Sequence, residues 1–184
     1  WAAGTPSLRT HVIKLADTTE INAVVIDIKD YNGKITIPAE SDIVVREGFL
    51  ERRIPNIREM IADLHKRNIY VIGRITVFQD PLYARAHPER AVQKESDKSV
   101  WKDYKKLSFV DVSAREYWDY IVALSEDAYT LGFDELNFDY IRFPSDGNMK
   151  DIYYPISNDA LVDDPTNGKA VALEKFFAYL AEKL

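Results

Sequence analysis

Two apolar runs decide the fold: INAVVIDI at residues 21–28 and IYVIGRITV at residues 69–77. Both are rich in β-branched side chains, a pattern typical of strands that are covered on both faces, as in parallel sheets. A third strand is expected at residues 134–141, DELNFDYI, where apolar and polar residues alternate. A short strand is also expected at residues 108–112. These runs predict a parallel sheet.

Helical patterns separate and flank the strands. Apolar residues at helical spacing predict helices at residues 8–17, 54–66, 114–131 and 169–184. Ser113, with Glu116 three residues later, has the pattern of a capping box before the third of these helices, and Gly132 is expected to end it. The alternation of helices and strands predicts an α/β fold with right-handed crossovers.

The chain contains 184 residues, which is the size of one domain. A complete (β/α)8 barrel needs about 250 residues, and the predicted order begins and ends with a helix. We therefore expect residues 1–184 to form a single domain of the (β/α)8 TIM-barrel type that covers only part of the barrel, with an open sheet as the alternative. A partial barrel is expected to expose apolar surface at an open edge.

The composition argues against several classes of function. With 24 Lys and Arg against 30 Asp and Glu, the net charge of −6 argues against a nucleic-acid partner. No apolar run approaches the ~20 residues of a membrane-spanning helix, and no leader sequence is visible before Trp1. The chain has no cysteine, widely spaced histidines and no glycine-rich nucleotide loop, so neither a metal nor a cofactor is expected. The oligomeric state stays open.

Charged side chains near the C-terminal ends of the strands point to a site. In the third strand, alternation places Glu135, Asn137 and Asp139 on one face, with Asp139 at the C-terminal end. Asp27 and Arg74 interrupt the other two strands near the same end. Because barrel enzymes place catalytic groups there, we expect Asp27, Arg74 and Asp139 to converge on one pocket.

Carboxylates beside a guanidinium suit glycoside hydrolysis, because its transition state resembles an oxocarbenium ion. Asp139 and Asp27 are therefore the candidate catalytic residues, with Arg74 as a substrate-binding residue. The alternative is structural, namely a hydrogen-bond network or a buried ion pair.

Further candidate substrate-binding residues flank the strand ends: Asp30, Tyr31, Asp111, Tyr140 and Arg142. Arg142 could bind substrate or pair with Asp139. Asp111 could instead be a capping or turn residue before the following helix. Tyr31 and Tyr140 could stack on a sugar ring, as could Phe78 and Trp101, although each of these aromatic rings could equally belong to the core.

Four motifs resemble a bacterial family of glycosidase-type TIM barrels of unknown function, near the alpha-amylase-like enzymes. They are INAVVIDIKD at residues 21–30 with Gly33 after it, RITVFQDP at residues 74–81, WDY at residues 118–120, and GFDELNFDYIRFPSDG at residues 132–147. The resemblance implies a (β/α)8 barrel that this chain covers only partly. It also implies a polysaccharide or oligosaccharide substrate and a secreted or cell-surface location.

The same resemblance implies roles for single residues. By similarity to amylase-like barrels, Asp139 would be the nucleophile. Asn137 stands where those enzymes usually carry an arginine, which departs from the strict amylase mechanism. The general acid would come from the following strand, beyond Leu184. A non-catalytic carbohydrate-binding or cell-envelope scaffold domain on a degenerate barrel is the alternative function.

Overall fold

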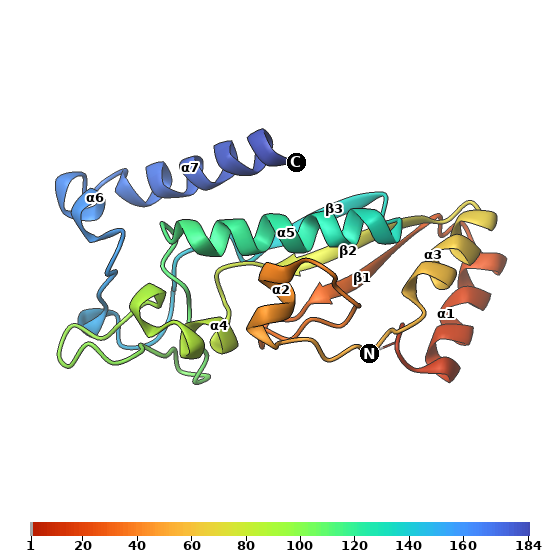
Figure 1. Cartoon of the computed structure of the whole chain (residues 1–184), viewed down its shortest axis with the longest axis horizontal. Coiled ribbons are helices and arrows are strands. Elements are labelled where there is room, and N and C mark those ends of the chain that lie inside the picture. The colour runs from red at the N-terminus through yellow and green to blue at the C-terminus, as the bar shows by residue number, and fades with distance from the viewer. Residues whose placement is uncertain (1) are drawn as a thin grey trace. The chain divides into compact units, whose positions relative to one another are not determined.

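The computed structural model describes residues 2–184, and for Asp159 it describes the backbone only. The chain divides into two compact units, which are described separately. The first comprises Trp1–Asp30, Lys34–Ile75 and Leu124–Phe138, and the second comprises Tyr31–Gly33, Thr76–Ala123 and Asp139–Leu184. Figure 1 shows helices and strands alternating along most of the chain, which confirms the predicted mixture of α and β elements.

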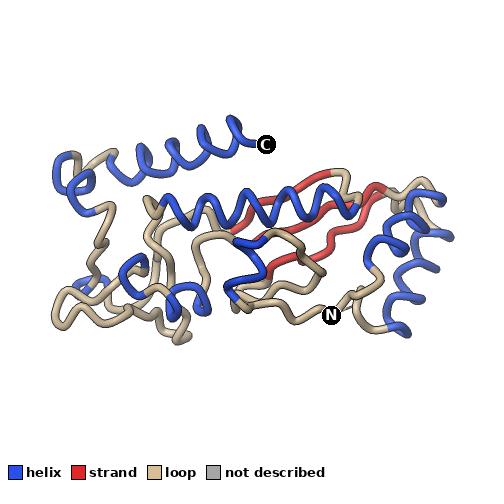
Figure 2. The backbone as a smooth tube through the Cα atoms, viewed as in Figure 1, coloured by secondary structure: helices blue, strands red, loops and turns tan. Residues whose placement is uncertain are grey.

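A three-stranded sheet is the centre of the first unit (Figure 2). Its strands are β1 (Ala23–Lys29), β2 (Tyr70–Thr76) and β3 (Glu135–Asp139), in the spatial order β1–β2–β3. β1 and β2 run parallel, and Asp27 lies directly across from Arg74. The three main strands therefore form where the sequence predicts them.

The two faces of this sheet differ. A Cβ on Gly73 would lie 2.3 Å from Ile28 Cδ1 and 3.1 Å from Leu136 Cδ2, so Ile28 and Leu136 share one face. Because side chains alternate along a strand, Arg74 and the polar residues of β3 lie on the opposite face. That face is open, since Val25 is 60% exposed. The prediction that both faces are covered is wrong for the described residues, and the apolar surface expected at an open edge stays a prediction.

Three helices accompany the sheet in the first unit: α1 (Pro6–Thr18), α2 (Asp42–Glu47) and α3 (Ile57–Lys66). α3 buries one apolar face, which includes Ile61 and Leu64, as its spacing predicts. α1 lies beside α3, and Arg9 donates a hydrogen bond to Asn56 at 3.3 Å. α2 has six residues and buries only Val44, so it is too short for a periodic pattern to reveal it.

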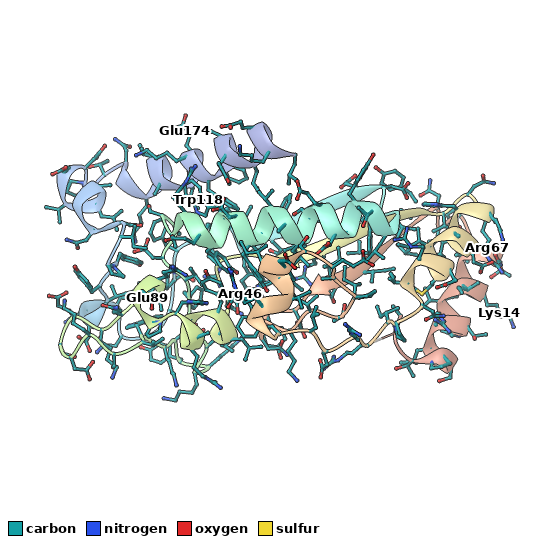
Figure 3. All side chains as sticks on the ribbon, viewed as in Figure 1. Lys14, Arg46, Arg67, Glu89, Trp118 and Glu174 are labelled. Carbon is teal, nitrogen blue, oxygen red and sulfur yellow. The ribbon has the colours of Figure 1, made fainter. Side chains whose placement is uncertain are left out.

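The second unit combines helices with long loops. Its helices are α4 (Pro81–Ala86), α6 (Asn158–Asp163), α7 (Gly168–Lys183) and the first half of α5 (Arg115–Leu131), with 3-10 turns at Pro88–Arg90 and Met149–Asp151. α7 packs against the first half of α5, which carries Trp118 (labelled in Figure 3). The rings of Phe176 and Trp118 pack edge to face with centroids 5.6 Å apart. None of the helices in the described chain is long and apolar enough to cross a membrane.

Two local predictions are wrong. Residues 108–112 form isolated antiparallel bridges, one of them to Ala91, and no continuous strand. The capping box is also absent, because α5 begins too late for Ser113 to cap it. Glu116 instead forms an ion pair with Arg90 at 3.4 Å. Both errors arise because tertiary contacts decide the partners of these residues.

Candidate active site

Asp139 is the last residue of β3, and the backbone turns sharply after it. Its carbonyl oxygen accepts a hydrogen bond from Val77 N at 2.8 Å, which keeps Asp139 paired up to the strand end. Tyr140 then has a φ of 55°, in the left-handed region that side chains disfavour. This turn lets Tyr140 N donate to Asp139 Oδ1 at 2.7 Å. The carboxylate is thus oriented by a strained residue, a feature that clusters at functional sites.

Arg142 contacts aromatic rings rather than Asp139. Its guanidinium carbon lies 5.2 Å from the ring centroid of Tyr140 and 5.7 Å from that of Phe109. Its Nη1 donates to Ser145 Oγ at 2.8 Å. Of the two roles that the sequence left open, pairing with Asp139 is the one that does not form. Arg142 stays half-buried, which leaves part of its guanidinium accessible to a ligand.

Tyr117 on α5 connects two groups beside this strand end. Its hydroxyl donates to Val77 O at 2.6 Å and lies 3.1 Å from Asp80 Oδ2. Burial, reinforced by the negative charge of Asp80, raises the pKa of Tyr117 well above its ordinary value. Because Val77 also donates to Asp139, the network fixes the chain segment that pairs with the candidate nucleophile.

Asp80 is a fully buried carboxylate that the sequence analysis did not select. Its Oδ1 accepts hydrogen bonds from Leu82 N at 3.2 Å and Tyr83 N at 2.9 Å and thereby caps α4. A Cβ on Gly33 would lie 2.3 Å from this oxygen, and Gly33 has a φ of 90°, so only glycine fits there. The available sequence signal was an Asp followed by Pro81, which is typical of a helix start.

Asp111 is also fully buried, and the chain itself supplies its hydrogen bonds. Oδ1 accepts from Ser113 N at 3.0 Å, and Oδ2 accepts from Ile156 N at 2.9 Å and Ser157 N at 3.0 Å. The Ser157 hydroxyl donates as well. These bonds connect the start of α5 to the segment before α6. The arrangement matches the alternative of a turn residue that the sequence left open for Asp111.

The aromatic candidates differ in exposure. Phe78 is 0% exposed and Trp101 is 1% exposed, so of the two roles left open for these rings the core position is the one observed. Tyr31 is 50% exposed, and its carbonyl oxygen accepts a hydrogen bond from Gln79 at 3.5 Å. Tyr140 is half-buried. Tyr31 and Tyr140 therefore remain the candidates for ring stacking.

Asp27 and Arg74 form a cross-strand ion pair in the first unit, with 3.0 Å between Oδ1 and Nη1. Their side chains are 48% and 36% exposed, so this is not the buried structural pair that the sequence allowed as an alternative. Asp30 follows β1 and closes a turn, since its N–H donates to Lys34 O at 3.0 Å. Asp139 lies in the second unit, so its convergence with Asp27 and Arg74 stays a prediction.

The fold and the strand ends define a class of protein, an α/β chain with a parallel sheet and acidic side chains where its strands end, as in glycosidase-type folds. The chain belongs to the family described as "Putative glycosyl hydrolase domain", whose model matches residues 1–184. The family resemblance seen in the motifs is therefore confirmed. A comparison with curated proteins finds no match.

Several solved structures are similar to this chain. A hypothetical protein from Ruminiclostridium thermocellum is 32% identical with a TM-score of 0.86, and the match covers 100% of this chain and 90% of that one. The alpha-galactosidase from Lactobacillus brevis is 13% identical with a TM-score of 0.63, covering 95% of this chain and 23% of that one. Alpha-L-fucosidase isoenzyme 2 from Paenibacillus thiaminolyticus is 12% identical with a TM-score of 0.60, covering 94% and 25%.

These two glycosidases share the fold with this chain. Sequence identities of 12–13% support no conclusion about function. The chain spans about a quarter of the length of either enzyme. Its three-stranded parallel sheet fits part of a barrel.

Proposed function

We propose that the chain is part of a (β/α)8 glycoside hydrolase domain that acts on a polysaccharide or oligosaccharide, with Asp139 as nucleophile or electrostatic stabiliser. The observation that carries the proposal is the position of the Asp139 carboxylate, at the C-terminal end of β3 and bonded to Tyr140 N. Barrel enzymes place catalytic groups at this end. The proposal includes a secreted or cell-surface location, where such polymers are met.

In this mechanism an oxygen of Asp139 attacks the anomeric carbon while a general acid protonates the departing glycosidic oxygen. The bond from the anomeric carbon to the leaving sugar breaks as the ester bond to Asp139 forms. Water then hydrolyses the ester and restores the carboxylate. The bond from Tyr140 N to Oδ1 orients the carboxylate, and Arg142 and Tyr31 are proposed to contact the sugar. Asp27, Arg74 and Asp30 remain predicted contributors from the sequence.

The alternative is a carbohydrate-binding or scaffold domain without catalysis. Asn137 supports it, since amylase-like enzymes usually carry an arginine at that position. A binding domain would use the same residues to hold a sugar but would need no second carboxylate. The two functions therefore differ in turnover rather than in binding.

The decisive experiment screens the full-length parent protein against bacterial exopolysaccharides and plant glycans, together with an Asp139→Asn variant. Asparagine nearly preserves shape but forms no glycosyl ester, so turnover is expected to fall by several orders of magnitude. Sugar binding and the melting temperature should change little. Asp146→Asn is the matched control, because Asp146 is an exposed carboxylate in the loop after β3 and should alter nothing.

Each other result has a definite meaning. Full turnover in Asp139→Asn would exclude catalysis by Asp139. Glycan binding by the unsubstituted protein without turnover on any bound glycan would favour the binding domain. A large fall in melting temperature with a proportionate loss of activity would assign Asp139 a structural role.

A further inference from the structure

We propose that this domain recognises an anionic glycan, one whose sugars carry carboxylate groups, through a lysine-rich hairpin at residues 94–106. The inference deepens the proposed function and rests on it, because it names the substrate class of the same unit. The hairpin belongs to the second unit and lies in the long connection between β2 and α5. Connections of this length in compact domains are usually functional.

The hairpin is a defined structure rather than an extended loop. It consists of two successive turns, the first of which is closed by the bridge between Gln93 and Val100. In the second turn, which we call the tip, the N–H of Asp103 donates to Leu107 O at 3.0 Å, and Asp103 Oδ1 accepts from Leu107 N at 2.8 Å. Asp103 is 6% exposed, and its carbonyl oxygen accepts from the N–H of Lys106, which has a φ of 65°. The turn is therefore fixed before any ligand binds, which lowers the entropic cost of binding.

The lysines of the hairpin fall into two groups. Lys94 pairs with Asp97 at 3.4 Å, and Lys98 pairs with Glu95 at 2.9 Å. The charges of this first group are compensated by neighbours in sequence. These pairs leave the positive charge of the hairpin concentrated at its tip.

The second group lies at that tip and consists of Lys102, Lys105 and Lys106, all exposed. In the described part of the chain these three side chains form no ion pair. Tyr104 lies among them and is 75% exposed. An exposed ring can pack on the apolar face of a sugar while adjacent ammonium groups bind its carboxylate, so the tip combines the two contacts that an acidic sugar needs.

A groove of about 530 Å³ runs beside the hairpin. Lys102 and Lys106 line it, together with Lys94 and Trp101. The carboxylate in its lining, Asp151, is held by hydrogen bonds from the Ser96 backbone and hydroxyl at 2.8 and 3.0 Å. The volume is in the range of small-molecule sites, and the lining carries more ammonium than carboxylate groups.

A chain of contacts within the second unit leads from this groove to the candidate nucleophile. The rings of Trp101 and Phe109 have centroids 6.3 Å apart. The guanidinium of Arg142 lies over the rings of Phe109 and Tyr140, and Tyr140 follows Asp139 directly. These contacts pass through the buried rings of Trp101 and Phe109, and they join the groove to the segment that carries Asp139 within the second unit.

A glycan fits these charges better than a nucleic acid does. The protein carries a net charge of −6, and acidic residues alternate with lysines along the hairpin. Nucleic-acid binding needs a broad basic surface that neutralises many phosphates. Three uncompensated ammonium groups beside an exposed ring match instead a polymer with one weak charge per sugar.

The test measures binding without turnover, by titration calorimetry of the whole chain with three acidic polymers: polygalacturonate, alginate and hyaluronan. Fully methyl-esterified polygalacturonate is the matched neutral ligand, since it keeps the same backbone. We expect at least one acidic polymer to bind about tenfold more tightly than its neutral counterpart at 50 mM NaCl, and this preference to shrink at 300 mM because salt screens exposed charges.

Two triple variants then locate the site. The hairpin variant combines Lys102→Gln, Lys105→Gln and Lys106→Gln, and it should lower the affinity for the acidic polymer about tenfold. The control removes the same charge from exposed lysines outside the hairpin and should stay within about twofold of the original affinity; it combines Lys14→Gln (Figure 3), Lys66→Gln and Lys175→Gln. Both sets are exposed, so the melting temperature should be unchanged in each.

Three results would overturn the proposal: no binding to any acidic polymer, equal binding to acidic and esterified forms, or equal losses in the two variants. Tighter binding to a DNA duplex than to every acidic glycan would also overturn it, in favour of a nucleic-acid surface. If acidic glycans bind at the hairpin but the full-length parent protein hydrolyses none of them, the hydrolase proposal fails while this one stands.

Discussion

The aspartates of this chain form two groups that differ in burial. Asp80 and Asp111 lie in the long connection after β2, are fully buried, and receive hydrogen bonds from the chain around them. Asp27 and Asp139 lie on strands, where Asp27 is 48% exposed and Asp139 is half-buried. A buried charge needs several partners to offset its lost hydration, whereas an accessible one does not. The first group therefore holds loops together, and the second is open to a ligand.

The largest expected effect comes from Asp111→Ala, which tests the first group. The substitution leaves the N–H groups of Ser113, Ile156 and Ser157 without their acceptor, and an unsatisfied buried donor costs about 1–3 kcal/mol. We expect the free energy of unfolding to fall by about 3 kcal/mol or more, measured by urea denaturation. Asp146→Ala, an exposed control, should change it by less than about 0.5 kcal/mol. Equal effects of the two would remove the distinction between the groups.

Much of the fold could be predicted because the signals are local. The apolar runs of β1 and β2 and the spacing of Ile61 and Leu64 in α3 each lie within one element. Short helices such as α2 carry too few residues for a period to be visible. The burial of Trp101 could not be predicted either, because its ring is covered by Gly147, 46 positions further along the chain, where a Cβ would lie 2.6 Å away.

The candidate site was predictable in part for the same reason. Asp139 was visible because alternation along one strand places it at a known end of the sheet. Asp80 was not, because its role depends on the close fit to Gly33 and on the hydroxyl of Tyr117, which lies on another element. The charge of the hairpin tip depends equally on which lysines find partners, and only the folded chain decides that.

A second test compares two buried tyrosines whose hydroxyl groups differ in hydrogen bonding. The hydroxyl of Tyr117 donates to Val77 O, whereas that of Tyr154 is buried with no partner in the described chain. Tyr117→Phe should lower the free energy of unfolding by about 1–3 kcal/mol. Tyr154→Phe should leave it unchanged or raise it by up to about 2 kcal/mol, because the substitution removes an unsatisfied group. Thermal unfolding of both variants measures the difference, and a loss of stability in Tyr154→Phe would show that its hydroxyl has a partner.

Alkaline pH tests the same two tyrosines without mutation. Burial raises the pKa of Tyr117 and of Tyr154 above the ordinary value, assisted by the charges of Asp80 and Asp111 respectively. The folded state then holds these protons more tightly than the unfolded state, so their contribution is complete below about pH 10 and declines above it. Each such tyrosine should lower the free energy of unfolding by about 1.4 kcal/mol per pH unit in that range. Urea denaturation from pH 9 to 11 should show this slope, and it should be smaller in the double Phe variant; an equal slope there would assign it to other groups.

The smallest effect on the free energy of unfolding is expected at the Asp27–Arg74 pair, because both side chains are exposed. An exposed ion pair contributes about 0.2–1 kcal/mol, because water already solvates both charges and their ordering costs entropy. A double-mutant cycle of Asp27→Asn and Arg74→Gln should therefore give a coupling energy below about 1 kcal/mol that decreases further in 1 M NaCl. The measurement is the free energy of unfolding of the four proteins in urea at low and high salt.

A coupling of about 3 kcal/mol that persists in salt would make the pair a structural element comparable to Asp111. A small coupling combined with weaker glycan binding in either single variant would instead place the pair among the groups that the fold leaves available to a ligand.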